Sequence, residues 1–420
     1  MKYSGVEWIG EIPDNWSIRK VKQCFYISKE KAHIENPTIL SLARAGVKVR
    51  DISNNEGQLA ASYNNYNPVI PGDLLLNPMD LYSGANCSLS EVSGVISPAY
   101  VNLRKCVELN PKFFDYYFKT QYWAMTMFAH GKGVSFDNRW TMNAESILNY
   151  YLPFPSIEEQ NKIVEKINEK TAEIDSLIRI ENQQIEKLKE YKQAVITEAV
   201  TKGLNKNAVM KDSGIERIGK IPESWKTAST KSIFEIIAGA TPDTGNIDNW
   251  DGNIIWITPA DYKTGDVFVN SGRRNLSQLG YDSCSTTLIP PGNIIFSKRA
   301  PIGLIAINNK ELCTNQGCLS CINKQNISIK YFYYQMSAYT KYYELFGCGT
   351  TFKEISAQKF GNFSLVFPPK YAQEDIVKYL DAKCDDIAKL IEIKQQKIEL
   401  LAKYKKSIIY ECVTGKKETS

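Results

Sequence analysis

The sequence contains two copies of the same pair of segments, and this duplication limits the folds open to it. Residues 4–16 return as residues 213–225 with eight of thirteen positions identical. A longer match pairs residues 152–201 with residues 365–414, with 21 identities in 50 positions and no gap. Self-similarity on this scale indicates a structural unit that is built more than once. The chain is therefore expected to hold two similar halves.

The stretches between the matched segments differ strongly from each other. Only short echoes remain, such as Pro-Gly-Asp-Leu at residues 71–74 against Pro-Gly-Asn-Ile at residues 291–294. Each half thus has a similar beginning, a variable body and a similar end. Duplicated proteins usually keep the body as well as the edges. Divergence confined to the bodies therefore indicates that each body recognises something different.

The matched end segments carry the pattern of long helices. Apolar residues recur in alternating three- and four-residue steps through residues 157–200 and 371–413, and neither range contains Pro or Gly. Gly203 and Gly415 follow as stop signals. Each helix of about 44 residues, rising ~1.5 Å per residue, is expected to be ~65 Å long. The apolar seam consists of Ile163, Ile167, Ile174, Ile178, Ile185, Leu188 and Val195 in the first copy and Ile376, Leu380, Ile387, Ile391, Ile398, Leu401 and Ile408 in the second.

Polar residues interrupt both seams, and the seams need a partner. Glu181 and Lys192 interrupt the first copy, and Lys394 and Lys405 interrupt the second. A seam this narrow cannot be buried within one helix. Two separate homodimeric zippers would cover it, as would pairing of the two helices of one chain. We favour pairing of the two helices within the chain. Each helix follows its own body, so a pseudo-twofold axis that relates the two bodies would make the helix pair antiparallel.

The variable bodies are expected to be mixed and rich in strands. Residues 253–258, 293–297 and 304–307 are short β-prone runs bounded by Gly and Pro. The Tyr-rich residues 113–127 and 330–345 predict one helix in each body. The expected fold class is therefore α+β, with two similar mixed α/β domains, separated by two long antiparallel coiled-coil helices and related by a pseudo-twofold repeat. The expected boundaries are 1–151 for the first domain, 152–204 for the first helix, 205–364 for the second domain and 365–420 for the second helix.

The net charge of +5 is only weakly basic, and it is unevenly spread. Residues 1–155 carry a net charge of +1, residues 156–204 carry −2, residues 205–364 carry +4 and residues 365–420 carry +2. Electrostatic attraction to nucleic acid is therefore expected mainly from the second body.

The sequence predicts a cytoplasmic protein. Its beginning lacks a basic stretch followed by an apolar one, which argues against a signal peptide. No apolar run approaches the ~20 residues that span a bilayer, so no membrane association is expected. The ten Cys are irregularly spaced, as is typical of reduced thiols.

The organisation and its motifs resemble the specificity subunits of type I restriction–modification enzymes. Both copies of the opening motif read Ser-Gly-Val/Ile-Glu-x-Ile-Gly-x-Ile-Pro-x-x-Trp, and both helices follow Phe-Pro-x-x-x-x-Gln-x-x-Ile-Val. In the second body, residues 256–261, 297–303 and 315–317 are similar to a common class of target-recognition domain. The first body departs from that class, with Ser-Pro-Ala-Tyr at residues 97–100 where the second has Asn-Gln-Gly.

The resemblance implies a function in DNA recognition without catalysis. Each variable domain would read one half of a split, asymmetric site on double-stranded DNA through the major groove. The helices would set the length of the unread spacer and dock two methyltransferase (M) subunits, and restriction (R) subunits would complete the complex. The chain would hold no cofactor, because S-adenosylmethionine, ATP and Mg²⁺ would bind to the partner subunits.

Polar residues in the loops of the two bodies are the candidates for DNA contacts. Arg and Lys read guanine and Asn and Gln read adenine, while contacts to phosphate position the protein. The alternative for each of them is an ordinary solvated side chain. The candidates are Arg44, Lys48, Arg50, Asn77, Tyr82, Lys132 and Arg139 in the first body and Tyr262, Arg273, Arg274, Lys298, Arg299 and Gln316 in the second.

Two alternative functions are a stand-alone methyltransferase or nuclease and a coiled-coil structural adaptor. Asn-Pro-Met-Asp at residues 77–80 is similar to an amino-methyltransferase motif but lacks its aromatic residue. No Gly-x-Gly loop is expected after a strand, where a cofactor would need it, and the sequence has no P-loop motif. The two His, His33 and His130, are too isolated for ordinary His-based catalysis. We therefore expect no catalytic residues.

A zinc site is the one metal site that the sequence suggests. Cys313, Cys318, Cys321 and Cys348 include a single Cys-x-x-Cys pair. A structural zinc site needs two such pairs or added His. The pair lies in a β-rich run, which favours buried thiols, and we expect no metal site.

Overall fold

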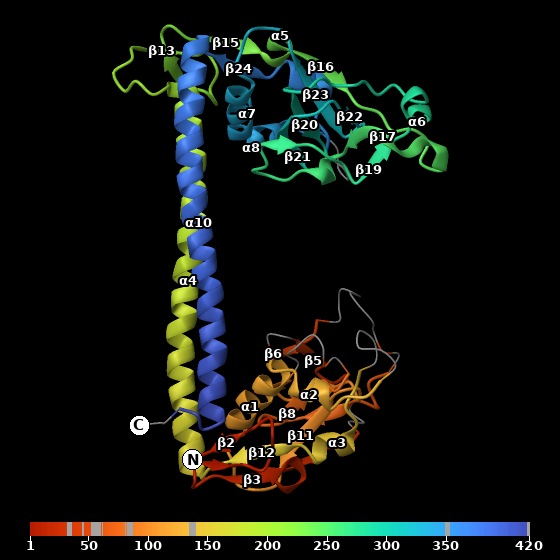
Figure 1. Cartoon of the computed structure of the whole chain (residues 1–420), viewed down its shortest axis with the longest axis vertical. Coiled ribbons are helices and arrows are strands. Elements are labelled where there is room, and N and C mark those ends of the chain that lie inside the picture. Colours follow the sequence, from red (N-terminus) through yellow and green to blue (C-terminus); the bar gives the residue numbers. More distant parts are fainter. Residues whose placement is uncertain are drawn as a thin grey trace. The chain divides into compact units, whose positions relative to one another are not determined.

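The chain folds as two compact units, Met1–Asn182 with Gln395–Ser420, and Gln183–Lys394 (Figure 1). Each contains a mixed α/β domain and half of each long helix, α4 (Ile157–Lys202) and α10 (Lys370–Val413). The expected fold class is confirmed, although the compact units divide the chain within the helices rather than at their ends. This computed structural model describes residues 1–31, 36–43, 46–51, 60, 62–79, 81, 87–133, 140–348 and 353–417.

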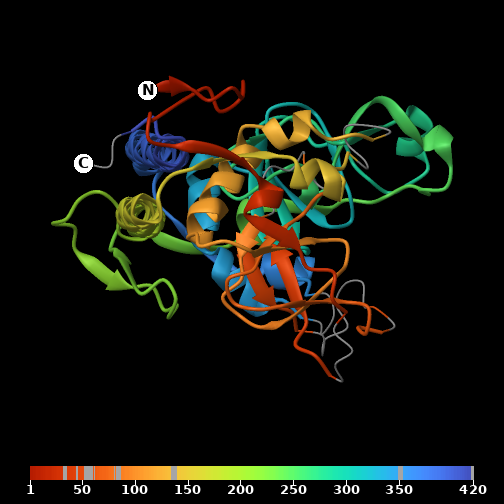
Figure 2. The same cartoon turned by 90° about the horizontal axis from the view of Figure 1, so that it is seen from below.

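The helices α4 and α10 run antiparallel and lie side by side in both views of the fold (Figures 1 and 2). In the first unit, Lys405 Nζ lies 2.7 Å from the Asp175 carboxylate, and Lys397 Nζ lies 2.6 Å from Glu181 Oε1. Residue numbers therefore fall along α10 as they rise along α4. In the second unit, Lys394 Nζ donates to Gln184 Oε1.

The apolar seam lies inside the helix pair of each unit. Thr171 and Glu181, both on the seam face of α4, are also buried, and Glu181 is satisfied by the ion pair with Lys397. The helices therefore shield one another in the way their heptads require. The seam residues of α4 and α10 that are buried are Ile163, Ile167, Ile174, Ile185, Val195, Ile376, Leu380, Ile387 and Ile408, and those that are half-buried are Ile178, Leu188, Ile391, Ile398 and Leu401.

Each domain has its own central sheet, and the two sheets have the same arrangement of strands although the sequences of the domains diverge. In the first domain the strand order is β4-β11-β8-β9, and in the second it is β16-β23-β20-β21-β18. The first four strands of each sheet pair antiparallel, and only β18 joins its neighbour in parallel. The first sheet comprises β4 (Phe25–Ile27), β8 (Leu74–Leu76), β9 (Cys87–Leu89) and β11 (Val101–Lys105), and the second β16 (Phe234–Ala238), β18 (Phe268–Val269), β20 (Ile294–Lys298), β21 (Ile302–Asn308) and β23 (Cys318–Asn323).

Smaller sheets complete each domain. Each opening motif contains the second strand of a hairpin, β1-β2 or β13-β14, whose first strand directly precedes the motif. The strand after each hairpin pairs with the strand before the long helix, as β3-β12 and β15-β24. The sheets β5-β6 and β7-β10 belong to the first domain, and β19-β17-β22 belongs to the second. Their bounds are β1 (Lys2–Tyr3), β2 (Glu11–Ile12), β3 (Ser17–Lys20), β5 (Leu40–Ala43), β6 (Gly46–Val49), β7 (Asn67–Val69), β10 (Gly94–Ile96), β12 (Tyr151–Phe154), β13 (Met210–Asp212), β14 (Lys220–Pro222), β15 (Lys226–Ser229), β17 (Trp250–Ile257), β19 (Arg274–Leu276), β22 (Cys313–Thr314) and β24 (Ser364–Phe367).

The single helix predicted for each body is wrong, because each is broken in two. α1 (Pro111–Trp123) ends before Met125, whose left-handed φ of 59° starts the short α2 (Thr126–Ala129). In the second body, α7 (Ile329–Ala338) and α8 (Thr340–Phe346) are separated by Tyr339. None of the described helices combines the length and apolarity needed to cross a bilayer. The remaining short helices are α3 (Ala144–Leu148), α5 (Thr230–Ile233), α6 (Gln278–Asp282) and α9 (Ala357–Gly361).

A buried glutamine attaches each long helix to its domain. Gln160 is 0% exposed, accepts from the backbone N–H of Asn110 at 2.8 Å and donates to the Pro155 carbonyl at 3.0 Å. Its counterpart Gln373 is 1% exposed, accepts from Ser328 N at 2.9 Å and donates to the Pro368 carbonyl at 2.8 Å. The Phe-Pro-x-x-x-x-Gln motif is thus a clamp between the start of a long helix and the N-cap of α1 or α7.

Each long helix ends on a glycine that packs against a copy of the opening motif. Gly203 has φ +76°, and a Cβ there would lie 3.0 Å from Trp225 Cζ2. Gly415 has φ +70°, and a Cβ there would lie 2.3 Å from Pro13 Cδ. Both positions therefore need glycine for its left-handed conformation and for close approach. The repeat of the opening motif is explained by these two equivalent contacts.

The clamp predicts a matched pair of stability defects. Gln160→Ala or Gln373→Ala leaves a buried N–H and a buried carbonyl without partners, and each such group costs about 1–3 kcal/mol. Differential scanning calorimetry should show a fall in Tm of about 5–20 °C for the unit that carries the substitution. Gln183, which is exposed on α4, provides the control, since Gln183→Ala should leave Tm unchanged. An equal, small shift in all three variants would contradict the clamp.

Candidate nucleic-acid interface

Several loops of the second domain converge at one edge of its five-stranded sheet. The register pairs Ala238 with Leu319 and Ser297 with Cys318, so β16 and β20 end where β23 begins. The loops after β16, after β20 and before β23 therefore meet at this edge. Their approach is close, because a Cβ on Gly239 would lie 2.2 Å from the Thr314 carbonyl oxygen.

Two of the predicted basic residues share one carboxylate at this edge. Lys298 Nζ lies 2.8 Å from Glu354 Oε1, and Arg299 Nη1 lies 3.5 Å from Glu354 Oε2. The side chain of Lys298 is 16% exposed and that of Arg299 is 36% exposed. The turn below them is held by Ser297, whose hydroxyl donates to the Pro301 carbonyl at 2.6 Å. The two cations are thus oriented before any ligand arrives, and Glu354 partly neutralises them.

The polar residues at the beginning of β23 belong to the same edge. The exposed side chain of Gln316 accepts a hydrogen bond from Thr241 Oγ1, which lies on the loop after β16. Asn315 Oδ1 accepts from Gly317 N at 2.9 Å and shapes the turn. The structure therefore brings the Asn-Gln-Gly segment next to the loop after β16.

The neighbouring Arg273 and Arg274 are held by different means. Arg273 donates from its backbone N–H to Asp261 Oδ1 at 3.0 Å and from Nη2 to the Ala260 carbonyl at 2.9 Å. Its side chain is nevertheless 75% exposed. The Arg274 guanidinium lies over the Trp250 ring, 4.0 Å from the centroid. Arg273 therefore has donors free for a ligand, whereas Arg274 is largely engaged in stacking.

Asp261 is the organising residue of this loop, and its function has no signature in the sequence. Its side chain is 3% exposed. Oδ2 accepts from both the backbone N–H and the hydroxyl of Thr258 at 2.7 Å, while Oδ1 accepts from Arg273 N. Thr258 and Asp261 form a capping box around the short 3-10 helix Pro259–Asp261. The Thr-Pro-Ala-Asp motif is thus explained as a rigid loop.

Two of the predicted DNA-contact residues are buried in the folded domains. Tyr262 is 2% exposed, its hydroxyl lies 3.7 Å from Cys318 Sγ, and burial raises its pKa well above the usual range. Asn77 is 8% exposed, and its Oδ1 accepts from Met79 N at 3.0 Å. Polar side chains that are already hydrogen-bonded in the core cannot reach a base edge. Both residues shape loops instead.

The first domain presents its described candidates from separate loops. Lys48 is exposed on β6, and Arg50 is half-buried just after it. Lys132 is exposed, and its backbone pairs with that of Thr141 in an isolated bridge. The other three candidates, Arg44, Tyr82 and Arg139, lie outside the described residues, as does His33.

Two contributors at the edge of the second sheet were not predicted from the sequence, Thr241 and Glu354. Each acts through a contact with a residue far away in the chain, Gln316 for one and Lys298 with Arg299 for the other. A distant ion pair has no local sequence signature.

The Cys-x-x-Cys pair is unsuited to chelation. Cys318 and Cys321 lie in one strand, β23, at an odd spacing, so their side chains point to opposite faces of the sheet. They belong to different core clusters accordingly. Burial raises the pKa of Cys313 and Cys318 to about 12, which keeps both as thiols at neutral pH. Cys348 is exposed and contacts Lys359.

Comparison with known proteins relates part of the chain to one family. Residues 222–401 match the family described as the type I restriction modification DNA specificity domain. The chain is 34% identical over 189 residues to the MjaIX type I restriction enzyme specificity subunit of Methanocaldococcus jannaschii, covering 44% of this chain and 43% of that relative. It is 27% identical over 153 residues to the HindI specificity subunit of Haemophilus influenzae, covering 36% of this chain and 33% of the relative. These alignments span less than half the length of either relative.

Solved structures show the same fold over almost the whole chain. One belongs to work on complex assembly and conformational transition of the type I R-M system, with a TM-score of 0.71 at 16% identity, covering 96% of this chain and 98% of the other. The HsdS subunit from Thermoanaerobacter tengcongensis gives a TM-score of 0.53 at 16% identity with the same coverage. Residues 222–401 are similar in sequence to a type I restriction modification DNA specificity domain. Over almost its whole length the chain shares the fold of these two solved structures.

Asp261 provides the test of the rigid loop. Asp261→Ala removes the acceptor for three donors and should destabilise the second unit by about 2–3 kcal/mol, since hydrogen bonds to charged groups are the strong ones. Calorimetry should show a lower Tm for that unit and an unchanged one for the first. Asp386, exposed on α10, provides the control through Asp386→Ala. Equal Tm values for the two variants would mean that the loop does not depend on Asp261.

Proposed function

We propose that this chain is the DNA-reading subunit of a type I restriction–modification complex and has no catalytic activity of its own. Each domain reads one half of a bipartite, asymmetric site on double-stranded DNA through the loops at one edge of its central sheet. The observation that supports this most is the combination of one strand order with two different loop sets. A shared framework with different loops is what two different half-sites require. The protein acts in the cytoplasm, where the DNA is.

In the second domain, the proposed contacts follow from exposure and donor chemistry. Arg273 offers an exposed guanidinium, which suits a phosphate or a guanine edge. Lys298 and Arg299 are held in place by Glu354 and gain a stronger partner when a phosphate approaches. Gln316 has an amide group at the same edge and suits adenine. Arg274 contributes to the interface by stacking on the Trp250 ring, which holds its guanidinium in one place.

In the first domain, we assign the corresponding function to the exposed cations of its loops. Lys48 and Lys132 are exposed, and Arg50 follows β6. Arg44, Tyr82 and Arg139 remain candidates from the sequence. A +1 net charge over residues 1–155 means that this half relies on placement rather than on overall attraction.

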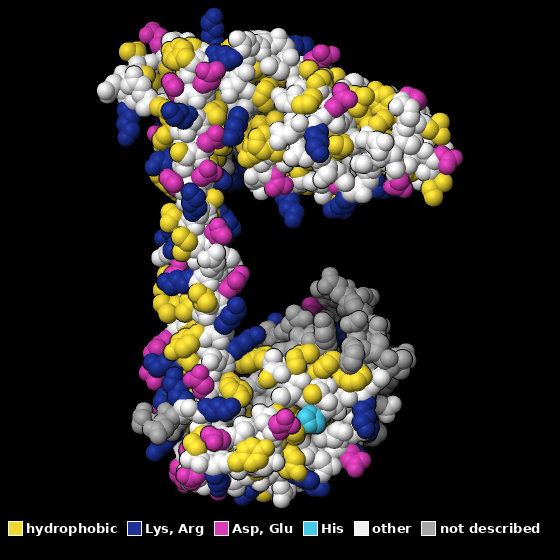
Figure 3. All heavy atoms as spheres, in the orientation of Figure 1, with side chains coloured by type: hydrophobic (Ala, Val, Ile, Leu, Met, Phe, Trp, Pro, Cys, Tyr) yellow, Lys and Arg dark blue, Asp and Glu magenta, His cyan; other side chains and the backbone are white. Residues whose placement is uncertain are grey.

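The helices are the proposed docking surface for the partners. Large apolar side chains are exposed on them, visible as patches between charged side chains in Figure 3. Exposed apolar patches of this kind mark surfaces that bind proteins. Two M subunits would dock there, R subunits would join the complex, and S-adenosylmethionine, ATP and Mg²⁺ would bind to those partners. The exposed residues are Leu177, Ile180, Leu400 and Tyr404 in the first unit and Tyr191, Leu390 and Ile393 in the second.

A charge series at Glu354 tests the DNA interface. Glu354→Gln frees Lys298 and Arg299 and should tighten binding to duplex DNA several-fold, with a steeper dependence on salt. Lys298→Ala should weaken binding and reduce the slope of log K against log salt by about one. Fluorescence anisotropy of a labelled duplex over a KCl series measures both. Glu216→Gln, an exposed change of the same charge on the opening motif, is the control. Identical curves for Glu354→Gln and Glu216→Gln would exclude this loop from the interface.

A domain exchange tests the division between the two half-sites. Residues 230–363, which lie between β15 and β24, can be replaced by the corresponding body of another type I specificity subunit. Methylation mapping in cells that also express the partner subunits should then show one changed half-site and one unchanged half-site. A change in both halves, or in neither, would contradict one domain reading one half.

A further inference from the structure

In the first copy of the opening motif, the final two residues hold a carboxylate. The Trp16 indole N–H donates to Glu159 Oε1 at 2.8 Å, and Asn15 Nδ2 donates to Glu159 Oε2 at 3.1 Å. Trp16 is only 2% exposed, so its N–H needs this acceptor. Glu159 lies in the first turn of α4, where the helix dipole also favours negative charge.

In the second copy, both donors are kept and the carboxylate is absent. Ser224 and Trp225 correspond to Asn15 and Trp16, but Ala372 stands at the position of Glu159. Trp225 is 5% exposed, and no described residue accepts from its indole N–H. That nitrogen is also not among the sealed, unpaired polar atoms of the described residues, so it is open to the space beside it.

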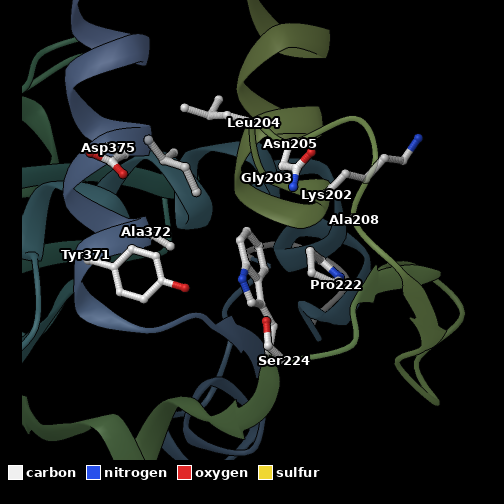
Figure 4. A pocket seen from close by; sticks show the side chains of 12 residues that line it. Lys202, Gly203, Leu204, Asn205, Ala208, Pro222, Ser224, Tyr371, Ala372 and Asp375 are labelled. Atoms are coloured by element: carbon white, nitrogen blue, oxygen red, sulfur yellow. The ribbon is translucent and has the colours of Figure 1, made fainter.

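A pocket of about 280 Å³ occupies the place that the missing carboxylate leaves, and Trp225 lines it (Figure 4). Tyr371 and Ala372 of α10 form one wall, and Pro222 and Ser224 form part of the opposite one. In Figure 4 the Tyr371 hydroxyl points into the pocket. With the indole N–H and the Ser224 hydroxyl, it makes a third donor. All the lining residues belong to the second unit.

The charged side chains that line the pocket are of mixed sign. Lys202 and Asp375 both line it and carry opposite charges, and the Lys202 amine points outward in Figure 4. The first turn of α10 contains no acidic residue, whereas that of α4 contains Glu158 and Glu159. The positive end of the α10 dipole therefore lacks the negative charge that its counterpart has.

We propose that this pocket binds the carboxylate of an acidic side chain presented by a partner protein, in the position that Glu159 fills in the first copy. The Trp225 N–H and the Ser224 hydroxyl donate to the two carboxylate oxygens, as Trp16 and Asn15 donate to Glu159. A polypeptide fits better than a free acid, because the exposed aromatic ring of Tyr371 at the mouth offers a surface typical of protein interfaces. One unit of the chain thus contains its own acid, and the other takes one from a partner. That the partner is another subunit of the restriction–modification complex rests on the proposed function, whereas carboxylate binding by the pocket does not.

The pocket can be tested in the full-length chain with 5-fluorotryptophan and fluorine NMR. Trp225→Phe assigns the Trp225 resonance. Four probes are titrated: the tripeptides acetyl-Gly-Glu-Gly-amide, acetyl-Gly-Gln-Gly-amide and acetyl-Gly-Arg-Gly-amide, and free glutarate. We expect the Trp225 resonance to shift saturably with the Glu peptide, with an affinity at least about tenfold above that of the Gln peptide. Preference for the Arg peptide, binding of glutarate alone, or no difference between Glu and Gln would overturn the proposal.

Two substitutions keep the test decisive if Trp225→Phe impairs folding. Ala372→Glu restores the residue of the first copy and should abolish the response to the Glu peptide while raising Tm. Asp375→Asn removes the nearby negative charge and should increase affinity for the Glu peptide several-fold. An unchanged peptide response in Ala372→Glu would place the binding elsewhere and overturn the proposal. Because no DNA is present, these results stand apart from the tests of DNA reading.

Discussion

The structure depends on two apolar seams that are each too narrow for a single helix to bury. Pairing α4 with α10 in antiparallel orientation solves this within one chain, and the polar interruptions become ion pairs rather than defects. Glu181 is the clearest case, since it is buried on the seam and compensated by Lys397. A buried charge without a partner is costly, so this pair favours one register of the helices over its neighbours. The two domains are attached to helices whose pairing is fixed in this way.

The parts that were predictable from the sequence are those with a local or repeated signature. Heptad spacing and the absence of Pro and Gly gave α4 and α10 nearly to the residue, and identity between the copies revealed the two opening motifs. The breaks at Met125 and Tyr339 were not predictable, because both stretches read as continuous helix and only tertiary packing interrupts them. The function of Gln160 was likewise hidden, since a repeated glutamine does not show which backbone groups it joins.

At the candidate DNA interface, the sequence indicated polar loops but not which of their side chains are exposed. Arg273 is exposed as expected, whereas Tyr262 is in the core, and both lie in the same polar loop region. Burial is a property of the folded domain and cannot be read from residue type. Glu354 was missed for a related reason, because its partners Lys298 and Arg299 are brought to it only by the sheet. The shared strand order of the two bodies, with little sequence in common, was beyond any local pattern.

The contact between Gly415 and Pro13 has a consequence for the order in which the chain folds during synthesis. The core of the first unit includes Ile408, Ile409 and Val413 of α10, next to Ile163 and other residues made much earlier. The second unit needs nothing beyond Lys394. On the ribosome, the later domain can therefore be completed first, while the earlier one waits with an uncovered apolar face. The core of the first domain is complete only after residues 408–413 have been made.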